Sequence, residues 1–229
     1  MPDQDLSAIA PDGLFKSPAL LERYSLHFGA LRASVRSLFE LGVYRGGSLQ
    51  MWRDYFPGAV IAGLDLNVET LPGDMTRIRF YPGSQDDTAL LTRIAEECAP
   101  EGFDIIIDDC AHVGTLAKTT FWHLFDNHLK PGGIYVIEDW GTGYWDTWGD
   151  GRRFEQPSDY DQSFGAGEPR RRIFPSHQVG MPGFLKQLID ECALTDILMP
   201  GYSATSYRSP HKPISRIDIY LGQAFVFKG

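Results

Sequence analysis

Two short apolar runs that each end in a pair of carboxylates constrain this chain most. The run that begins at Phe103 ends in Asp108 and Asp109. A second run ends in Glu138 and Asp139. Strands buried in a parallel sheet have this continuous apolar pattern, and ligands of open α/β sheets bind beyond the carboxyl ends of such strands. Because clustered carboxylates are costly without a positive partner, the two runs predict a cation site beside a reaction site.

Strand and helix patterns alternate around these runs from about residue 35 onward. Such alternation predicts a single Rossmann-like, doubly wound α/β sheet with helices on both faces. Two closely spaced segments near the C-terminus predict an antiparallel hairpin at the edge of this mostly parallel sheet. The predicted strands are 35–41, 59–64, 76–81, 103–107, 134–137, 214–220 and 225–228, and the predicted helices are 47–55, 86–98, 115–129 and 182–192.

The length of 229 residues fits one domain, which we predict to span residues 1–229. Residues 1–34 are predicted to be a helical segment, because Ser17 and Pro18 form a helix-start signal before an amphipathic pattern. Residues 140–180 are rich in Gly, Asp, Trp, Tyr and Arg and show little periodicity. A long segment of this kind inside a compact domain is usually functional, so we predict a lid or insert there.

The net charge of −9 argues against a nucleic-acid partner, since phosphate binding needs clustered Lys and Arg. No segment approaches the roughly 18 apolar residues of a membrane span. The acidic N-terminus lacks the pattern of a secretory signal, and the three cysteines lack metal or redox spacing. These features favour a cytoplasmic protein without a membrane partner, and they leave a homo-oligomeric state open.

A glycine-rich turn follows the first predicted strand, within Glu40–Ser48. Glycines at a strand-to-helix turn let the backbone approach a ligand closely, although a simple tight turn has the same pattern. Asp65 closes the next strand, at the distance from the turn expected for an acid that binds ribose hydroxyls. Gln85 and Asp86 follow the third strand and offer polar groups for an adenine edge, or a cap for the next helix. Together the three strand ends favour a nucleotide-like cofactor.

With these features the chain resembles the class I S-adenosylmethionine-dependent methyltransferases. More narrowly, it resembles the metal-dependent sugar (rhamnosyl) O-methyltransferases of macrolide and tetracenomycin biosynthesis. The resemblance rests on Glu40–Ser48, on Ile107–His112, and on Tyr135–Trp140 with the Tyr144-Trp145 pair that follows. It covers roughly residues 35–145 plus the terminal hairpin, and it implies S-adenosylmethionine as the cofactor.

The resemblance also implies roles for individual residues. In the sugar O-methyltransferases, the acid three residues before the histidine and the Glu-Asp pair bind magnesium, and the histidine is the proposed base. This implies Mg²⁺ (or Mn²⁺) on Asp109, Glu138 and Asp139, and His112 as the catalytic base beside Asp109. The candidate cofactor-binding residues are Glu40, Gly42, Gly46, Ser48, Asp65, Gln85, Asp86 and Asp108.

Residue chemistry by itself supports the metal assignment. Carboxylate oxygens without thiolates favour Mg²⁺, Mn²⁺ or Ca²⁺ over Zn²⁺. The alternative is a hydrogen-bonded cluster of acids that caps helices. For His112 the sequence leaves three readings open: a base, a metal ligand, or a cap of the following helix.

Four aromatic residues follow the second acidic pair closely. Aromatic faces suit a glycosylated or polyketide-like acceptor, whereas a small core under the loop would have the same composition. The residues are Trp140, Tyr144, Trp145 and Trp148.

The function that the sequence favours is Mg²⁺-dependent methyl transfer from S-adenosylmethionine to a small-molecule hydroxyl, with a sugar of a glycosylated natural product as the acceptor. A catechol-type O-methyltransferase would use the same metal chemistry. An NAD-dependent oxidoreductase would use a similar sheet, although the chain lacks the G-x-G-x-x-G turn. A further alternative is a non-methylating relative that acts as a partner in a hydroxylation complex.

Overall fold

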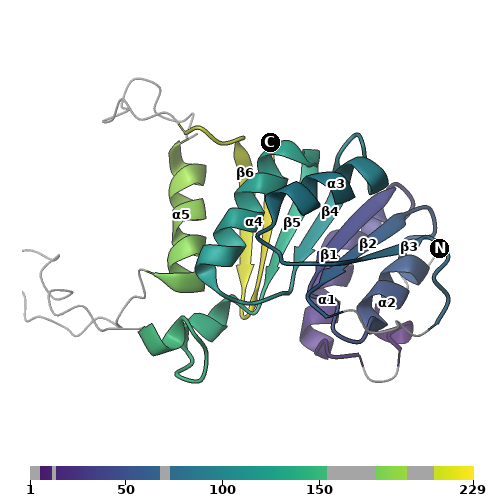
Figure 1. Cartoon of the computed structure of the whole chain (residues 1–229), viewed down its shortest axis with the longest axis horizontal. Helices are drawn as coiled ribbons and strands as arrows, with labels where there is room; N and C mark the ends of the chain where they lie inside the picture. The colour runs from purple at the N-terminus through teal and green to yellow at the C-terminus, as the bar shows by residue number, and fades with distance from the viewer. Residues whose placement is uncertain (1–5, 12–13, 68–72, 154–178, 195–208) are drawn as a thin grey trace, which may run out of the picture.

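A computed structural model gives the fold of the chain and describes residues 6–11, 14–67, 73–153, 179–194 and 209–229 (Figure 1). Its centre is a seven-stranded sheet in the order β3-β2-β1-β4-β5-β7-β6. The strands from β3 to β5 pair in parallel, whereas β7 runs antiparallel to β5 and to β6. The predicted sheet and its C-terminal hairpin are therefore confirmed. The strands are β1 Ser37–Leu41, β2 Val60–Asp65, β3 Ile78–Pro82, β4 Phe103–Asp108, β5 Leu129–Glu138, β6 Ile214–Tyr220 and β7 Gln223–Lys228.

Helices cover both faces of the sheet and give it two cores. Within β4, Ile105 and Ile107 pack with the helices α1 and α2, whereas Ile106 packs with α3, α4 and α5. Successive residues of a strand point to opposite faces, so burial on both faces explains the uninterrupted apolar run. The helices are α1 Pro18–Phe28, α2 Gly47–Tyr55, α3 Thr88–Cys98, α4 Gly114–Asn127 and α5 Gly180–Leu194, with 3-10 turns at η1 Leu6–Ala8, η2 Gly29–Leu31, η3 Trp140–Tyr144 and η4 Gly151–Arg153.

Side-chain hydrogen bonds cap the first turns of α1 and α3. The Ser17 side chain accepts a hydrogen bond from Leu20 N, so α1 begins where the sequence predicted. The cap of α3 is Asp87, which accepts from Leu90 N at 3.0 Å. Asp86 therefore does not cap this helix, and it stays exposed at the end of β3.

The boundary between α4 and β5 differs most from the prediction. The sequence placed a helix to residue 129 and a strand from 134, but α4 ends at Asn127 and β5 already begins at Leu129. Leu129 pairs with Phe103, and the register then shifts across the Pro131–Gly133 stretch. The Lys228 ammonium donates to the Leu129 carbonyl and to carbonyls at the end of α4. These tertiary contacts set the boundary, and local turn signals do not reveal them.

Part of the predicted lid at 140–180 lies outside the described residues, namely 154–178. The structure describes its first part, 140–153, which continues directly from β5. Within the described chain, no helix is both long enough and apolar enough to cross a membrane. The extent of the domain and of the lid stay predictions.

Candidate active site

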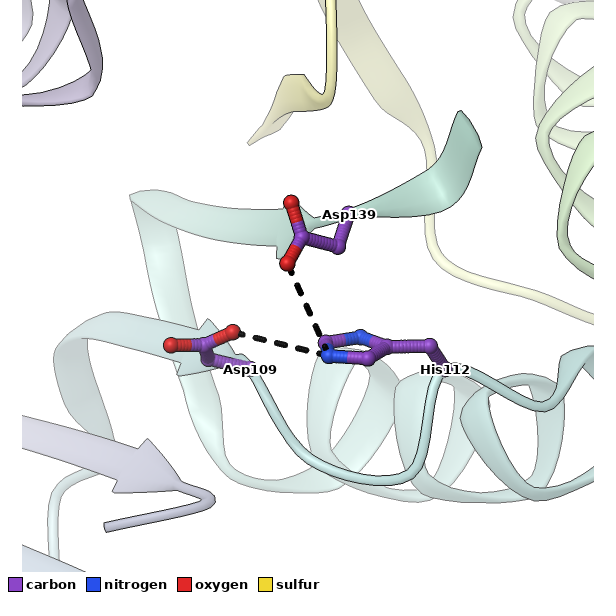
Figure 2. A group of neighbouring side chains, drawn as sticks. All are labelled: Asp109, His112 and Asp139. Atoms are coloured by element: carbon purple, nitrogen blue, oxygen red, sulfur yellow. Dashed lines mark ion pairs between the residues drawn. The ribbon is translucent and has the colours of Figure 1, made fainter. Parts of the chain in front are cut away.

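The carboxyl ends of β4 and β5 bring three of the predicted residues together. Asp109 follows β4, Asp139 follows β5, and His112 lies in the loop that leads to α4. His112 Nε2 lies 3.8 Å from Asp109 Oδ1 and 3.8 Å from Asp139 Oδ2 (Figure 2). Possible ligand atoms of the three residues all lie within 4.8 Å of one another. The two carboxylates at this spacing fit a divalent cation such as Mg²⁺ or Mn²⁺, with the imidazole beside the ion as a base or, alternatively, as a further ligand.

Backbone strain is concentrated at this site. His112 and Asp139 both have a φ of 50°, and so does Tyr44 in the glycine turn. Non-glycine residues in the left-handed region cost about 1–3 kcal/mol each and cluster where function requires a fixed geometry. Asp and His tolerate this region better than most residue types. The strain therefore supports a functional reading of the Asp109–His112–Asp139 group.

The surroundings of His112 suit a proton acceptor. Its side chain is mostly buried, and this burial lowers the pKa of the imidazole, which favours the neutral form. The backbone of Glu138 opposes this shift, since it favours the protonated imidazole. The ring of Trp148 packs edge-on against it, with the ring centroids 5.4 Å apart. These contacts hold the ring so that Nε2 faces the two carboxylates.

A second acidic group lies beside the first and contains a residue that the sequence analysis missed. Lys16 Nζ contacts Glu138 Oε1 at 2.5 Å, Asp109 Oδ2 at 2.8 Å and Glu40 Oε1 at 3.4 Å. The Tyr24 hydroxyl donates to the same Glu138 oxygen at 2.5 Å. The acids had indicated a positive partner, but no sequence signal placed a lysine from the N-terminal segment among them.

The two acids at the end of β5 thus face different groups. Asp139 joins Asp109 and His112, whereas Glu138 joins Lys16 and Glu40. Burial raises the pKa of Glu138 to about 7, although Lys16 and Tyr24 favour its ionised form. Glu40 and Asp109 also have pKa values raised by burial. A metal contact from Glu138 stays a prediction, since its Oε1 is occupied by protein donors.

The glycine turn after β1 is built around close backbone approaches. Gly42 has a φ of +86°, and a Cβ there would lie 2.0 Å from the Asp109 backbone oxygen. Only glycine fits this position, which holds the turn against the site. Asp65 Oδ2 accepts hydrogen bonds from Val43 N and Tyr44 N, both at 2.9 Å. Asp65 therefore supports the turn, and a ribose contact through Asp65 stays a prediction.

The N-terminal segment lies over this turn. A small cavity of about 50 Å³ between them is lined by Lys16, Gly42, Ser48 and Asp109, among others. Gly46, with a φ of +78°, is the N-cap of α2, so Ser48 lies in its first turn. The structure thus brings Gly42, Gly46 and Ser48 to one edge of the sheet. A contact of each of these residues with a cofactor stays a prediction.

Gln85 and Asp108 point into the fold. The Gln85 amide donates to Asp108 at 3.3 Å and to Thr120 at 3.2 Å, and its oxygen accepts from Ala111 N at 3.0 Å. Tyr135 also donates to Asp108, whose pKa burial raises to about 7. These bonds brace the loop between β4 and α4. Contacts of both residues with a cofactor stay predictions.

A cavity of about 530 Å³ opens on the other side of Asp139. Arg23 of α1, Trp140, Tyr144 and Trp145 line it together with Asp139. This volume lies within the range of small-molecule sites. Trp145 is 54% exposed and Tyr144 is 36% exposed, so these rings face solvent and the cavity instead of forming a buried core.

Asp150 fixes the described part of the predicted lid. Its Oδ2 accepts hydrogen bonds from Gly114 N at 2.7 Å and from Met181 N at 2.9 Å. These donors stand at the starts of α4 and α5, so one buried carboxylate caps two helices. Asp150 therefore anchors the segment that holds Trp148 against His112.

We expect Asp150→Ala to lower the free energy of unfolding by about 2–4 kcal/mol, because two helix starts lose their acceptor. Urea denaturation measures the change. Asp146→Ala is the matched control, since Asp146 lies in the same segment but is exposed. If both variants were as stable as the wild type, Asp150 would not stabilise the starts of the two helices.

The comparisons with known proteins agree with this geometry. No protein-family model matches the chain. The chain is 35% identical over 213 residues to mycinamicin VI 2''-O-methyltransferase of Micromonospora griseorubida, and 34% identical over 216 residues to 8-demethyl-8-(2-methoxy-alpha-L-rhamnosyl)-tetracenomycin-C 3'-O-methyltransferase of Streptomyces olivaceus. Both alignments cover 90% of this chain but 47% and 48% of the relatives. The chain thus spans about half the length of these relatives.

Two solved structures of MycE methyltransferase from the mycinamycin biosynthetic pathway match the whole fold. One, in complex with Mg and SAH, matches with a TM-score of 0.75 and 31% identity over 99% of this chain and 55% of that chain. The other also contains mycinamycin VI and matches with a TM-score of 0.70 at 31% identity over 100% of this chain and 55% of that chain. The strand order and these structures show that the chain has the class I methyltransferase fold, and its sequence is similar to those of macrolide and tetracenomycin sugar O-methyltransferases.

Proposed function

We propose that the protein is a Mg²⁺- and S-adenosylmethionine-dependent O-methyltransferase that acts on a sugar hydroxyl of a glycosylated natural product. One observation carries the proposal: Asp139 belongs to the Asp109–His112–Asp139 group and also lines the large aromatic cavity. An acceptor in that cavity would meet the metal and the imidazole at the same place. The homologous enzymes act on sugars of macrolides and tetracenomycins, which supports this acceptor class.

The residues of the site would divide the work as follows. Asp109 and Asp139 would hold the ion, with Glu138 as a further predicted ligand. A divalent ion, when bound, lowers the pKa of a coordinated hydroxyl and orients it. His112 Nε2 faces the space between the two carboxylates and would accept the hydroxyl proton. Methyl transfer then depends on in-line positioning of the two reactants, which the glycine turn and the aromatic wall would provide.

Calorimetry tests the cofactor and the metal together. We expect S-adenosylmethionine to bind with measurable heat, NAD to give none, and Mg²⁺ to bind at one site per chain in a titration that EDTA abolishes. The sheet matches methyltransferases, which is the basis for expecting S-adenosylmethionine over NAD. Tight NAD binding without S-adenosylmethionine binding would contradict the proposal.

The acceptor is tested by mass spectrometry with a panel of three probes. Mycinamicin VI, an L-rhamnosyl tetracenomycin and a simple catechol are each incubated with S-adenosylmethionine and Mg²⁺. A mass gain of one methyl group on a glycoside supports the sugar assignment. Methylation of the catechol alone would favour the catechol-type alternative. Cofactor binding without transfer to any probe would favour the non-methylating partner. A cytoplasmic location and homo-oligomerisation stay predictions.

A further inference from the structure

The β6–β7 turn, residues 220–222, borders the large cavity. Gly222 in this turn lines the cavity together with Asp139. The backbone N–H of Asp139 donates to the Gly222 carbonyl at 2.6 Å, and the Trp140 indole donates to the Tyr220 carbonyl at 3.0 Å. The turn therefore holds an acid of the site through its backbone, and a ring of the cavity wall through its indole nitrogen.

The Asp139 backbone depends on this turn. Asp139 has a φ of 50°, a strained conformation that persists for a non-glycine residue only where the surroundings fix it. Two hydrogen bonds fix it here, since its N–H donates to Gly222 and its carbonyl accepts from Thr142 N at 3.0 Å. The Asp139 carboxylate does not cap the 3-10 turn that follows. The backbone bonds therefore set where this carboxylate lies and how it faces His112.

Arg23 of α1 holds the β6–β7 turn from the other end of the chain. Its Nη1 donates to the Leu221 carbonyl at 2.6 Å, and its guanidinium carbon lies 5.2 Å from the centroid of the Tyr220 ring. The planar, charged guanidinium suits both contacts at once. One helical turn later, His27 Nε2 lies 3.1 Å from the Tyr220 hydroxyl. The α1 helix therefore contacts the turn at its backbone, at a ring and at a hydroxyl.

We propose that Arg23 is a positioning residue of the metal centre: it holds the β6–β7 turn, which fixes the Asp139 carboxylate and the Trp140 ring. The inference rests on the proposed function, in which Asp139 is a metal ligand. Partners that orient a metal ligand typically change metal affinity about 10–100-fold when they are lost. The inference also assigns a task to the C-terminal hairpin, because its turn supplies the acceptor for the strained Asp139 backbone.

Mn²⁺ binding to the full chain without an acceptor tests the role of Arg23, with free Mn²⁺ measured by electron paramagnetic resonance. We expect Arg23→Met to weaken Mn²⁺ binding about tenfold, because the turn loses its charged donor. Arg23→Lys keeps a charged donor without the planar group, so it should recover part of the affinity. Arg32→Met is the matched control, since Arg32 donates to the Tyr55 carbonyl at 2.8 Å and lies over the Tyr55 ring, at the C-terminal end of α2. It should bind Mn²⁺ like the wild type.

A second variant reaches the same turn through its backbone. Gly222 has a φ of +73°, so Gly222→Ala strains the residue whose carbonyl accepts from Asp139 N. The added Cβ would meet Asp139 Oδ1 at 3.7 Å, which is ordinary contact, so the effect acts through the backbone. Mn²⁺ binding should weaken about tenfold or more. Gly132→Ala is the matched control, because its φ is +75° and a Cβ there meets no described residue within 4 Å; its Mn²⁺ affinity should not change.

Arg23 also lines the large cavity, so a direct contact with the acceptor is the competing explanation. Such a contact would raise the KM for a glycoside and leave the Mn²⁺ affinity unchanged. This result for Arg23→Met would overturn the inference. So would wild-type Mn²⁺ affinity in Gly222→Ala, or equal losses in the two control variants. Circular dichroism checks the fold of each variant first, and if one of the two test variants does not fold, the other carries the test.

Failure of the metal proposal looks different, because the wild type then binds no Mn²⁺. Hydrogen exchange, measured by nuclear magnetic resonance, still decides the inference. The Asp139 amide should exchange at least about tenfold faster in Arg23→Met and in Gly222→Ala than in the wild type. The Asp109 amide is the reference, since it donates to the Leu41 carbonyl at 2.9 Å and should not change. An unchanged exchange rate of the Asp139 amide would overturn the inference.

Discussion

Replacing His112 with alanine is expected to lower the rate of methyl transfer roughly 10²- to 10⁴-fold, because the acceptor hydroxyl loses its base. The affinity for S-adenosylmethionine should change little, since the imidazole contacts Asp109, Asp139 and Trp148 and does not line the small cavity at the glycine turn. Single-turnover assays with a glycoside that the acceptor panel identifies measure the rate, and calorimetry measures the cofactor affinity.

Two further variants separate chemistry from structure at this position. His112 has a φ of 50°, and asparagine tolerates this conformation, so His112→Asn removes the base without adding backbone strain. It should be as inactive as His112→Ala. His123→Ala is the matched control, because His123 bonds Thr92 between α3 and α4, away from the acids. Near-normal turnover of both His112 variants would mean that another base, or the metal alone, suffices.

The second large effect is expected for Asp109→Asn, which should weaken Mg²⁺ binding about a hundredfold or more. Groups that only support metal ligands already cost about 10–100-fold when they are removed, and Asp109 would contact the ion itself. Its carboxylate belongs to both acidic groups, so neither group can compensate for the loss. Titration calorimetry with Mg²⁺ measures the affinity, and transfer activity should fall with it.

The neighbouring residue provides the control. Asp108→Asn also removes one buried carboxylate from the end of β4, but Asp108 points toward Gln85 and Tyr135. Its Mg²⁺ affinity should stay within about threefold of the wild type, because the lost charge does not belong to either acidic group. If Asp109→Asn binds Mg²⁺ as tightly as Asp108→Asn does, Asp109 is not a metal ligand.

Most strands were predictable because both faces of the sheet are covered. A strand buried on two sides needs an uninterrupted apolar run, and such runs are visible in the sequence. The start of β5 was not predictable from local signals. Leu129 joins the sheet through its pairing with Phe103, and Lys228 donates to the carbonyls beside it from the other end of the chain.

The arrangement of the site was likewise predictable only in part. Asp109, His112 and Asp139 follow two strands that are adjacent and parallel, so their meeting at one edge of the sheet was predictable from strand ends. The contact of Glu138 with Lys16 and the inward bonds of Gln85 were not predictable. These contacts depend on which partner groups other segments of the chain bring close to each side chain, and the local sequence does not show those partners.

The sequence by itself determined the sheet, the edge at which chemistry occurs, and the need for positive charge among the acids, because these follow from local periodicity and from the cost of buried carboxylates. Only the tertiary structure decided which cation meets which acid. Lys16 reaches Glu138 across 122 positions of the chain, and Tyr24 reaches it across 114. Contacts at such separations exist only in the folded chain, where α1 packs on the sheet, so the fold alone divides the acids into two groups.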